Sequence, residues 1–421
     1  MDDLKVLLRA VLNTVDSLVA DAFGSQPVHK PQAVITHGED GSVQTHFEMK
    51  PDYADMLFSL RQDLSTLPEV VALNEYVRNN HGLASNIRVD AAGVPLPNDA
   101  EHFLNFTLWP FMTRYFRDIS RVGEGVEGVI FDGLFGDLQR YVEEPQVAYI
   151  YEAPLVGLKA DMDRINFSDD VWARRRTDED IKMVSKPYSY GDPELNEVTF
   201  STHFLVSRVF VAKHAPLNSE DAAKISSEVL SAFRLYRSAA IRLGASRYYP
   251  ELRVGPMQGV MTTPAPFGLG GDYRLEESDV QNIKVLFERC GSNNDPRWRL
   301  ALRRLNLTFE RKLPEDRLID SWVGLETLLL PDGKDGELRF KGSMRLAQFL
   351  GEDSAQKLEL RKDTRTSYDR RSQVVHGNTP LNEDLPEVAN KTVELLRQVL
   401  VRWLDDTYPH DIKSIDDSFL S

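Results

Sequence analysis

Two side chains in the last third of the sequence could act together on a phosphodiester bond. Arg371 and His376 lie five residues apart, and Gly377 and Pro380 follow them as residues that end helices. This pattern predicts that His376 occupies the final turn of a helix. Unpaired carbonyl groups at a helix end favour a cationic imidazole, and histidine is the side chain whose charge changes near neutral pH.

The chemistry open to this pair is cleavage of RNA. A base can remove the proton of a ribose 2′-hydroxyl, and a cation can stabilise the charge on the attacked phosphate. His376 fits the first role and Arg371 the second. Five residues of α-helix span about 7.5 Å along the axis and about 140° around it. The two residues therefore do not share one helical face, which favours a composite site at a two-fold interface.

The sequence indicates neither a metal centre nor a disulfide framework. Cys290 is the single cysteine, which excludes a cysteine-based zinc site. The histidines show no metal-binding spacing such as two histidines four residues apart. We expect no metal and no cofactor, and the cysteine content fits a reducing cytoplasm.

The charge of the chain is uneven. Its formal net charge of -15 argues against broad affinity for nucleic acid, because such binding depends on Lys and Arg. Residues 281–312 nonetheless carry 8 basic side chains against 3 acids, and residues 361–380 carry 5 against 2. Arg365 and Arg370 belong to the second group and are candidate RNA contacts. The alternative is that both groups are solvated helix faces.

The N-terminal segment is not typical of a signal peptide or a membrane anchor. Acidic residues stand where a signal peptide is basic, and Arg9 and Asp16 interrupt the apolar positions. No stretch of the sequence approaches the roughly 18 apolar residues of a membrane-spanning helix. We predict an amphipathic helix over 1–23 and no contact with a membrane.

Residues 1–262 change character often and predict a mixed α/β region. The segment 33–49 alternates around a turn at 38–41, as in a hairpin. Further helices are expected at 51–63, 100–120 (broken at Pro110) and 219–243, and strands at 146–151 and 197–212.

A segment rich in Pro and Gly at 263–275 predicts a linker. Beyond it every periodic segment is helical, so 276–408 predicts a compact helical bundle, and 409–421 a frayed polar tail. The expected helices are 276–290, 296–312, 317–330, 337–350, 354–376 and 385–403. The expected fold class is α+β, with a mixed N-terminal region followed by an all-α bundle.

One carboxylate of the bundle requires a partner. Glu326 lies on the apolar stripe of the helix at 317–330. A buried carboxylate is costly unless it is paired, so a cation should lie beside it. We expect that cation to be Arg371 or Arg345, with Glu326 orienting the site. The alternative is a structural ion pair remote from the chemistry.

The residues around this site resemble the Apea-like branch of the HEPN family. Its pattern Tyr-Asp-x-Arg-Ser before Val-His-Gly is matched by Tyr368, Asp369, Arg371, Ser372, Val375, His376 and Gly377. An upstream Leu-Ile-Asp with Leu-Glu-x-Leu is matched by Leu318, Ile319, Asp320, Leu325, Glu326 and Leu328, and a later Arg-Leu-Ala by Arg345, Leu346 and Ala347. Three blocks in the same order are more specific than one. The resemblance covers 276–408.

The resemblance implies a helical domain that dimerises face to face and cleaves RNA without a metal, in antiviral (abortive infection) or toxin-like defence. Arg371 and His376 would be its catalytic pair. The candidate supporting residues are Glu326, Ser372, Tyr368 and Arg345. The expected partners are RNA, a second copy of the chain, and a trigger or partner protein at the N-terminal region.

Two alternatives stay open. Many active HEPN nucleases carry a longer polar residue after the arginine, where this sequence has Ser372. Together with the acidity of the chain, that difference favours an inactive HEPN module that binds RNA or a nucleotide, or holds a dimer together. The other alternative is a regulatory subunit whose N-terminal region binds a partner.

Two further motifs are expected to carry no function. Residues 123–128 read GEGVEG and match a dinucleotide pattern in letters, but they follow a helical segment and contain two glutamates. Residues 174–176 are three arginines beside an acidic segment, and we predict a solvated turn there.

Overall fold

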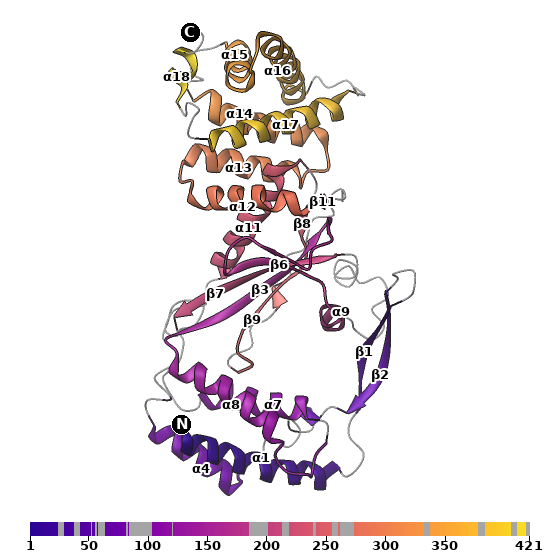
Figure 1. The fold of residues 1–421 in the computed structure, drawn as a ribbon, viewed down its shortest axis with the longest axis vertical. Coiled ribbons are helices and arrows are strands. Elements are labelled where there is room, and N and C mark those ends of the chain that lie inside the picture. Colours follow the sequence, from indigo (N-terminus) through magenta and orange to yellow (C-terminus); the bar gives the residue numbers. More distant parts are fainter. Residues whose placement is uncertain are drawn as a thin grey trace.

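The structure is a computed structural model of the whole chain. It describes residues 1–23, 29–37, 43–51, 53–54, 57, 64–80, 83, 103–119, 121–184, 201–212, 219–238, 241–254, 260–261, 273–331, 337–377, 384–405 and 411–417. The elements stack in three layers, from N-terminal helices through an antiparallel sheet to a C-terminal helical bundle (Figure 1). The predicted α+β fold class is confirmed.

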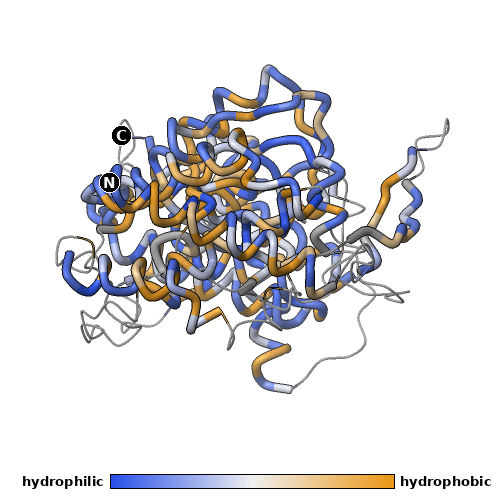
Figure 2. The backbone as a smooth tube through the Cα atoms, turned by 90° about the horizontal axis from the view of Figure 1, so that it is seen from below, coloured by the Kyte–Doolittle hydropathy of each residue, from blue (hydrophilic) through white to orange (hydrophobic). Residues whose placement is uncertain are grey.

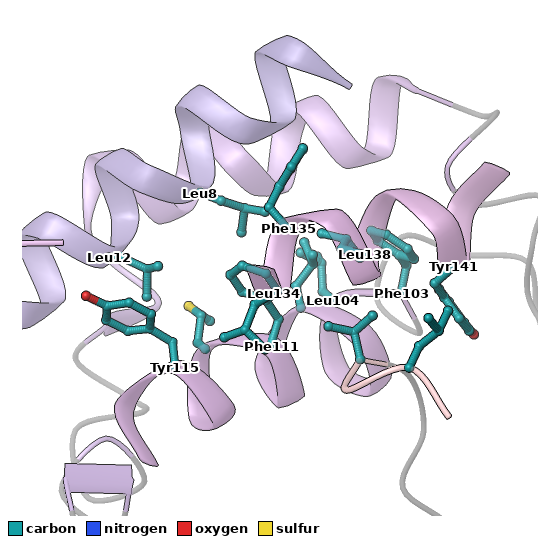
Figure 3. Close-up of a cluster of buried hydrophobic side chains, with 14 of the residues drawn as sticks. Leu8, Leu12, Phe103, Leu104, Phe111, Tyr115, Leu134, Phe135, Leu138 and Tyr141 are labelled. Atoms are coloured by element: carbon teal, nitrogen blue, oxygen red, sulfur yellow. The ribbon is translucent and has the colours of Figure 1, made fainter. Parts of the chain in front are cut away.

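The N-terminal layer is built on an amphipathic helix. Its elements are α1 (Asp2–Phe23), α4 (Pro68–Asn79), the π-helix η1 (Leu104–Leu108), α7 (Trp109–Asp118) and α8 (Gly128–Glu143). The helix predicted over 1–23 is α1, whose buried Leu8 and Leu12 face aromatic side chains of α7 and α8 (Figure 3). The helix predicted over 100–120 changes from π to α geometry at Trp109, and Pro110 lies in the first turn of α7.

The middle layer is an antiparallel sheet with the order β10-β9-β3-β7-β6-β5, in which β8 also pairs with β3. Its strands are β3 (Gln146–Val156), β5 (Arg164–Asn166), β6 (Val171–Arg175), β7 (His203–Ala212), β8 (Arg242–Leu243), β9 (Ser246–Pro250) and β10 (Val260–Met261). Tyr149, Tyr151 and Val209 pack against the N-terminal helices. Leu205 and other residues of the same sheet pack against α11 (Ser219–Tyr236).

Outside this sheet, β1 (His29–His37) and β2 (Val43–Pro51) form the predicted hairpin. The short α9 (Asp178–Val184) lies beside β1, where His37 is 2.8 Å from Asp178. The predicted turn at 38–41 and most of the predicted helix at 51–63 lie outside the described residues, as do 197–200 of the second predicted strand.

Two segments differ from the sequence-based expectation. The helix predicted to reach residue 243 ends at Tyr236, because residues 242–243 pair with β3 as β8. Residues 273–275, placed within the linker, form strand β11 (Tyr273–Leu275), which pairs in parallel with β4 (Leu158–Ala160). Strand pairing between distant segments overrides the local pattern in both places.

The prediction of a solvated turn at 174–176 is wrong, because Arg174 and Arg175 lie in β6 and only 24% of the Arg174 side chain is exposed. It contacts Glu152 at 2.8 Å and Asp180 at 2.7 Å, and Arg247 pairs with both of these carboxylates. Burial would raise the pKa of Asp180, but hydrogen bonds from Arg174 and the Thr177 amide outweigh it and lower that pKa to about 2. The cluster fixes α9 to the sheet.

The glycine-rich loop 123–128 holds a carboxylate of the protein itself. Gly123 and Gly125 have φ angles of 82° and 85°, and their amides donate to Asp16 of α1 at 2.9 and 3.0 Å. The Val126 amide donates to Asn13 of the same helix at 3.1 Å. Amides that could face a pyrophosphate are therefore already bound by α1.

The C-terminal layer contains α12 (Glu277–Ser292), α13 (Pro296–Thr308), α14 (Pro314–Leu329), α15 (Leu338–Leu350), α16 (Ser354–Val375) and α17 (Leu385–Trp403). Each begins and ends within a few residues of its predicted bounds. Trp298, Trp322 and Trp403 lie in its core. The tail is not frayed throughout, because α18 (Ile412–Asp417) buries Ile415 against the bundle.

The bundle is attached to the sheet layer through α11. Arg397 of α17 donates to the carbonyl groups of Leu235 and Tyr236, which end that helix. Arg234, 2% exposed, donates to the carbonyl groups of Asn306 and Ile241. Arg397 therefore satisfies the C-terminal end of α11 from the bundle side, and Arg234 of α11 donates in the opposite direction, to α13.

Hydrophilic and hydrophobic residues are mixed along the described chain (Figure 2). Among the described residues, none of the helices is both long enough and apolar enough to cross a membrane.

We predict that Gly123→Ala destabilises the protein, while Gly136→Ala does not. A Cβ at residue 123 would require a left-handed backbone and lie 3.0 Å from the Ala20 Cβ, so we expect a loss of about 1–3 kcal/mol. A Cβ at the helical Gly136 has no atom within 4 Å and should gain up to about 1 kcal/mol. Thermal unfolding of the two variants measures this contrast, and equal melting temperatures would contradict it.

Candidate functional site

The candidate site lies at the C-terminal end of α16. The helix begins after Asp353, whose side chain accepts a hydrogen bond from the Gln356 amide at 2.8 Å. It ends where the His376 amide donates to the Ser372 carbonyl at 3.1 Å and Gly377 adopts a φ of 68°. His376 is therefore at the end of its helix, as predicted, and it is exposed.

A chain of buried hydroxyl groups fixes α16 against two neighbouring helices. The indole Nε1 of Trp322 donates to the Ser367 hydroxyl at 2.8 Å, and that oxygen lies 2.6 Å from the Thr392 hydroxyl. Tyr368 packs edge-on against Trp322, with ring centres 5.0 Å apart. This chain joins α14, α16 and α17. The sequence analysis missed Ser367 and Thr392, since nothing local distinguishes them from exposed hydroxyl residues.

Arg371 is held by contacts on the inner side of this helix end. Its Nη2 atom lies 3.4 Å from Oε1 of Glu326, and its guanidinium lies 5.9 Å from the centre of the Tyr368 ring. The side chains of Arg371 and Glu326 are 24% and 25% exposed. Both can therefore be reached by a ligand. Of the two cations expected for Glu326, the structure places Arg371 beside it.

The charge of Arg371 does not fully compensate for the burial of the Glu326 carboxylate. Burial raises the pKa of the Glu326 carboxyl, and the charge of Arg371 offsets only part of that rise. The Nε atom of Arg371 is buried without a hydrogen-bond partner among the described residues. That buried atom cannot contact a ligand, but the exposed part of the guanidinium presents a positive charge that a phosphate could contact.

The two catalytic candidates lie on different sides of α16. Arg371 contacts Glu326 on α14, whereas the His376 ring is exposed and makes no hydrogen bond or ion pair with the described part of the chain. Ser372 lies between them and contributes its carbonyl to the helix end. This arrangement follows the offset of about 140° expected for five residues.

The other predicted site residues have separate partners. Arg345, 4% exposed, makes two contacts of 2.8 Å with Asp416 of α18 and donates to the Leu329 carbonyl at 2.9 Å. Arg370 pairs with Asp384 at the start of α17 at 2.7 Å. Arg345 therefore attaches the tail, and Arg370 is partly neutralised. Arg365 has no acidic partner in the described ranges.

The basic residues of 281–312 are largely used inside the bundle. Arg304 and Arg311 both bind Asp320, at 2.9 and 2.8 Å. Arg289 donates to the Leu404 carbonyl, and Arg299 to the Asn293 carbonyl. These side chains join helices. The charge count of this segment alone therefore does not define a nucleic-acid surface.

No group of three or more His, Cys, Asp or Glu side chains suited to a metal ion occurs in the described ranges. Cys290 is buried, and burial raises the pKa of its thiol to about 12. The thiol is therefore protonated near neutral pH and is not a nucleophile.

Comparisons with known proteins found no family model, no curated protein and no solved structure that matches the chain. The likeness to HEPN domains therefore depends on the residues quoted from the sequence.

We predict that Glu326→Gln alters the pH dependence of stability. A carboxyl whose pKa is raised on folding contributes most stability at acidic pH and loses that contribution as the pH rises through the folded pKa. The variant should match the wild type below about pH 4, and near pH 7 it should melt roughly 1–3 °C higher.

Glu359→Gln is the matched control, since Glu359 is exposed on the same helix bundle. Its melting temperature should follow that of the wild type at each pH. A Glu326→Gln variant that is less stable than wild type near neutral pH would show that the contact with Arg371 outweighs the burial of the carboxylate.

Proposed function

We propose that the chain is an endoribonuclease of the HEPN type that cleaves RNA without a metal. The observation that carries this proposal is an exposed His376 at the end of α16, with Arg371 held five residues earlier by Glu326 and Tyr368. The three sequence blocks that resemble Apea-like HEPN domains support it. They belong to α14, α15 and α16, which pack in one bundle.

In the proposed reaction, His376 removes the proton from a ribose 2′-hydroxyl. The 2′-oxygen forms a bond to phosphorus, the bond from phosphorus to the 5′-oxygen breaks, and the leaving 5′-oxygen takes up a proton from an imidazolium. The products are a 2′,3′-cyclic phosphate and a 5′-hydroxyl. Carbonyl groups at the end of α16 stabilise the imidazolium, and Arg371 stabilises the charge on the phosphate oxygens.

The proposed site is shared between two copies of the chain. A histidine and an arginine about 140° apart on one helix point in different directions and do not readily contact the same phosphate. Two helix ends related by a two-fold axis can place His376 of one copy beside Arg371 of the other. Glu326 then positions Arg371 and does not contact the RNA.

The N-terminal region is proposed to sense a trigger or restrain the nuclease. The contacts of Arg234 and Arg397 support this role, because they join α11 directly to α13 and to α17. The proposed setting, antiviral or toxin-like defence, comes from the family resemblance.

One observation favours a second candidate. Arg371 is already paired with Glu326, and the residue that follows it is the short Ser372. An inactive HEPN module that binds RNA through the same helix end would have this arrangement. It predicts RNA binding without turnover.

We predict that purified protein cleaves total cellular RNA in the presence of EDTA, and that Arg371→Ala and His376→Ala each lose cleavage by about 100-fold or more. Arg121→Ala and His46→Ala, which change exposed residues far along the chain, should cleave like the wild type. All variants must melt and elute alike before their rates are compared.

Equal cleavage by every variant would assign the activity to other residues. No cleavage by the wild type, together with RNA binding, would favour the inactive module. A stable complex with another protein and no RNA turnover would favour a regulatory subunit.

We further predict that the two inactive variants complement each other. In a mixed dimer of Arg371→Ala and His376→Ala, a site built from both copies is intact once. Random mixing makes half of the dimers mixed, so roughly a quarter of wild-type cleavage should return. No recovery in a mixture that exchanges subunits would show that each site lies within one copy.

A further inference from the structure

One exposed face of α16 extends from its first turns to the candidate site. Leu358 precedes His376 by five full helical turns, and Arg365 lies within about 20° of the same line. Lys362 and Arg361 lie about 40° and about 60° from it. Leu358 is 67% exposed, and Lys362 is exposed as well. We name these four residues with His376 the α16 stripe.

The α16 stripe is positively charged. The acids Glu359 and Asp363 of the same helix lie about 100° and about 140° away from His376. Asp369 does lie on the stripe, but Arg339 of α15 pairs with it. Lys362 and Arg365 have no acidic partner within the parts of the chain that the structure describes. The charge along this face is therefore available to an anionic ligand.

An exposed aromatic ring stands beside this charge. Phe340 in the first turn of α15 is 50% exposed, and the Arg361 guanidinium lies 5.8 Å from the centre of its ring. The Nε atom of Arg361 is buried, so a ligand could contact only the terminal nitrogen atoms of this guanidinium. α15 and α16 lie side by side at the end of the molecule that is remote from the sheet (Figure 1).

We propose that single-stranded RNA binds along the α16 stripe, with one base stacked on Phe340. Proteins that bind single strands combine cations for the phosphates with an aromatic side chain for the bases. Phosphates would contact Arg361, Lys362 and Arg365. A base in a duplex is stacked on its neighbours and cannot reach a protein ring, so the ligand is an unpaired strand.

This inference rests on the proposed function and adds a substrate class and a path to it. Arg361 precedes His376 by about 22 Å along the helix axis, and Arg365 by about 16 Å. A strand that follows the stripe would bring its backbone to the imidazole several nucleotides away from the stacked base. The base on Phe340 therefore does not adjoin the bond that is cut.

The test is the affinity of the full-length His376→Ala protein for a short fluorescent single-stranded RNA, measured by anisotropy at several salt concentrations. Adding Phe340→Ala should weaken binding by roughly tenfold. Adding Arg361→Ala and Arg365→Ala should lower the slope of log affinity against log salt by about 1.4. The controls are Phe210→Ala, which removes an equally exposed ring from β7, and Arg121→Ala.

Unchanged affinity and salt slope in the stripe variants would overturn the inference, and so would equal binding of a matched duplex. Phe340→Trp should keep or tighten binding, which separates lost stacking from lost folding. A wild type that cuts no RNA while its stripe binds as expected would contradict only the proposed function. If the wild type cleaves RNA but the Phe340, Arg361 and Arg365 variants bind RNA as tightly as their parent, only the RNA path along the α16 stripe would be contradicted.

Discussion

The structure at the candidate site depends on how a polar helix is held in place. Of the 22 residues of α16, only Thr364 and Ser367 are buried. Its apolar side chains Leu360, Tyr368 and Val374 pack against the core but are only partly buried, so the hydrophobic effect stabilises this helix less than the other helices of the bundle. The hydrogen bonds between Trp322, Ser367 and Thr392 hold α16 against α14 and α17, and the Tyr368 ring packs on Trp322. Because the hydroxyl groups of Ser367 and Thr392 both have partners, the helix has one defined orientation, and the residues on its remaining faces are free to meet a ligand.

The sequence predicts the bundle better than the sheet, for a physical reason. Helices depend on periodicity and end signals within a short window, so the bounds of α14 and α16 could be placed closely. Strands such as β6 and β11 are only a few residues long, and they exist because distant segments pair with them. The same distinction between local and distant information applies to side-chain contacts. The spacing of Glu326 indicated that it needs a cation, but only the packing of α14 on α16 selects Arg371 and leaves Arg345 to Asp416. The hydroxyl chain and the ring at Phe340 had no sequence signal.

The attachment of the bundle to the rest of the chain is polar as well. Arg397 binds carbonyl groups at the end of α11, Arg234 of α11 donates to the Asn306 carbonyl of α13, and Tyr236 donates to Asp279 of α12 at 2.5 Å. Removing either partner of such a buried contact leaves an unsatisfied group, so the two layers can separate only at a substantial cost. The same contacts join α11 to α17, which packs directly against α16. The proposed sensing role of residues 1–262 would depend on this connection.

The contact between Asp16 and the glycine loop also bears on how the chain folds during synthesis. The carboxylate and the Gly123 amide are 107 positions apart, and the apolar side chains of α1 pack on α7 and α8, which are made just as late. At usual rates of translation, α1 waits roughly 5–20 s for these partners. During that interval α4, which is made earlier and contacts α1, can cover only part of the row of leucine and valine side chains of α1. We therefore expect newly made chains to be more prone to aggregate before residue 143 has emerged than after it.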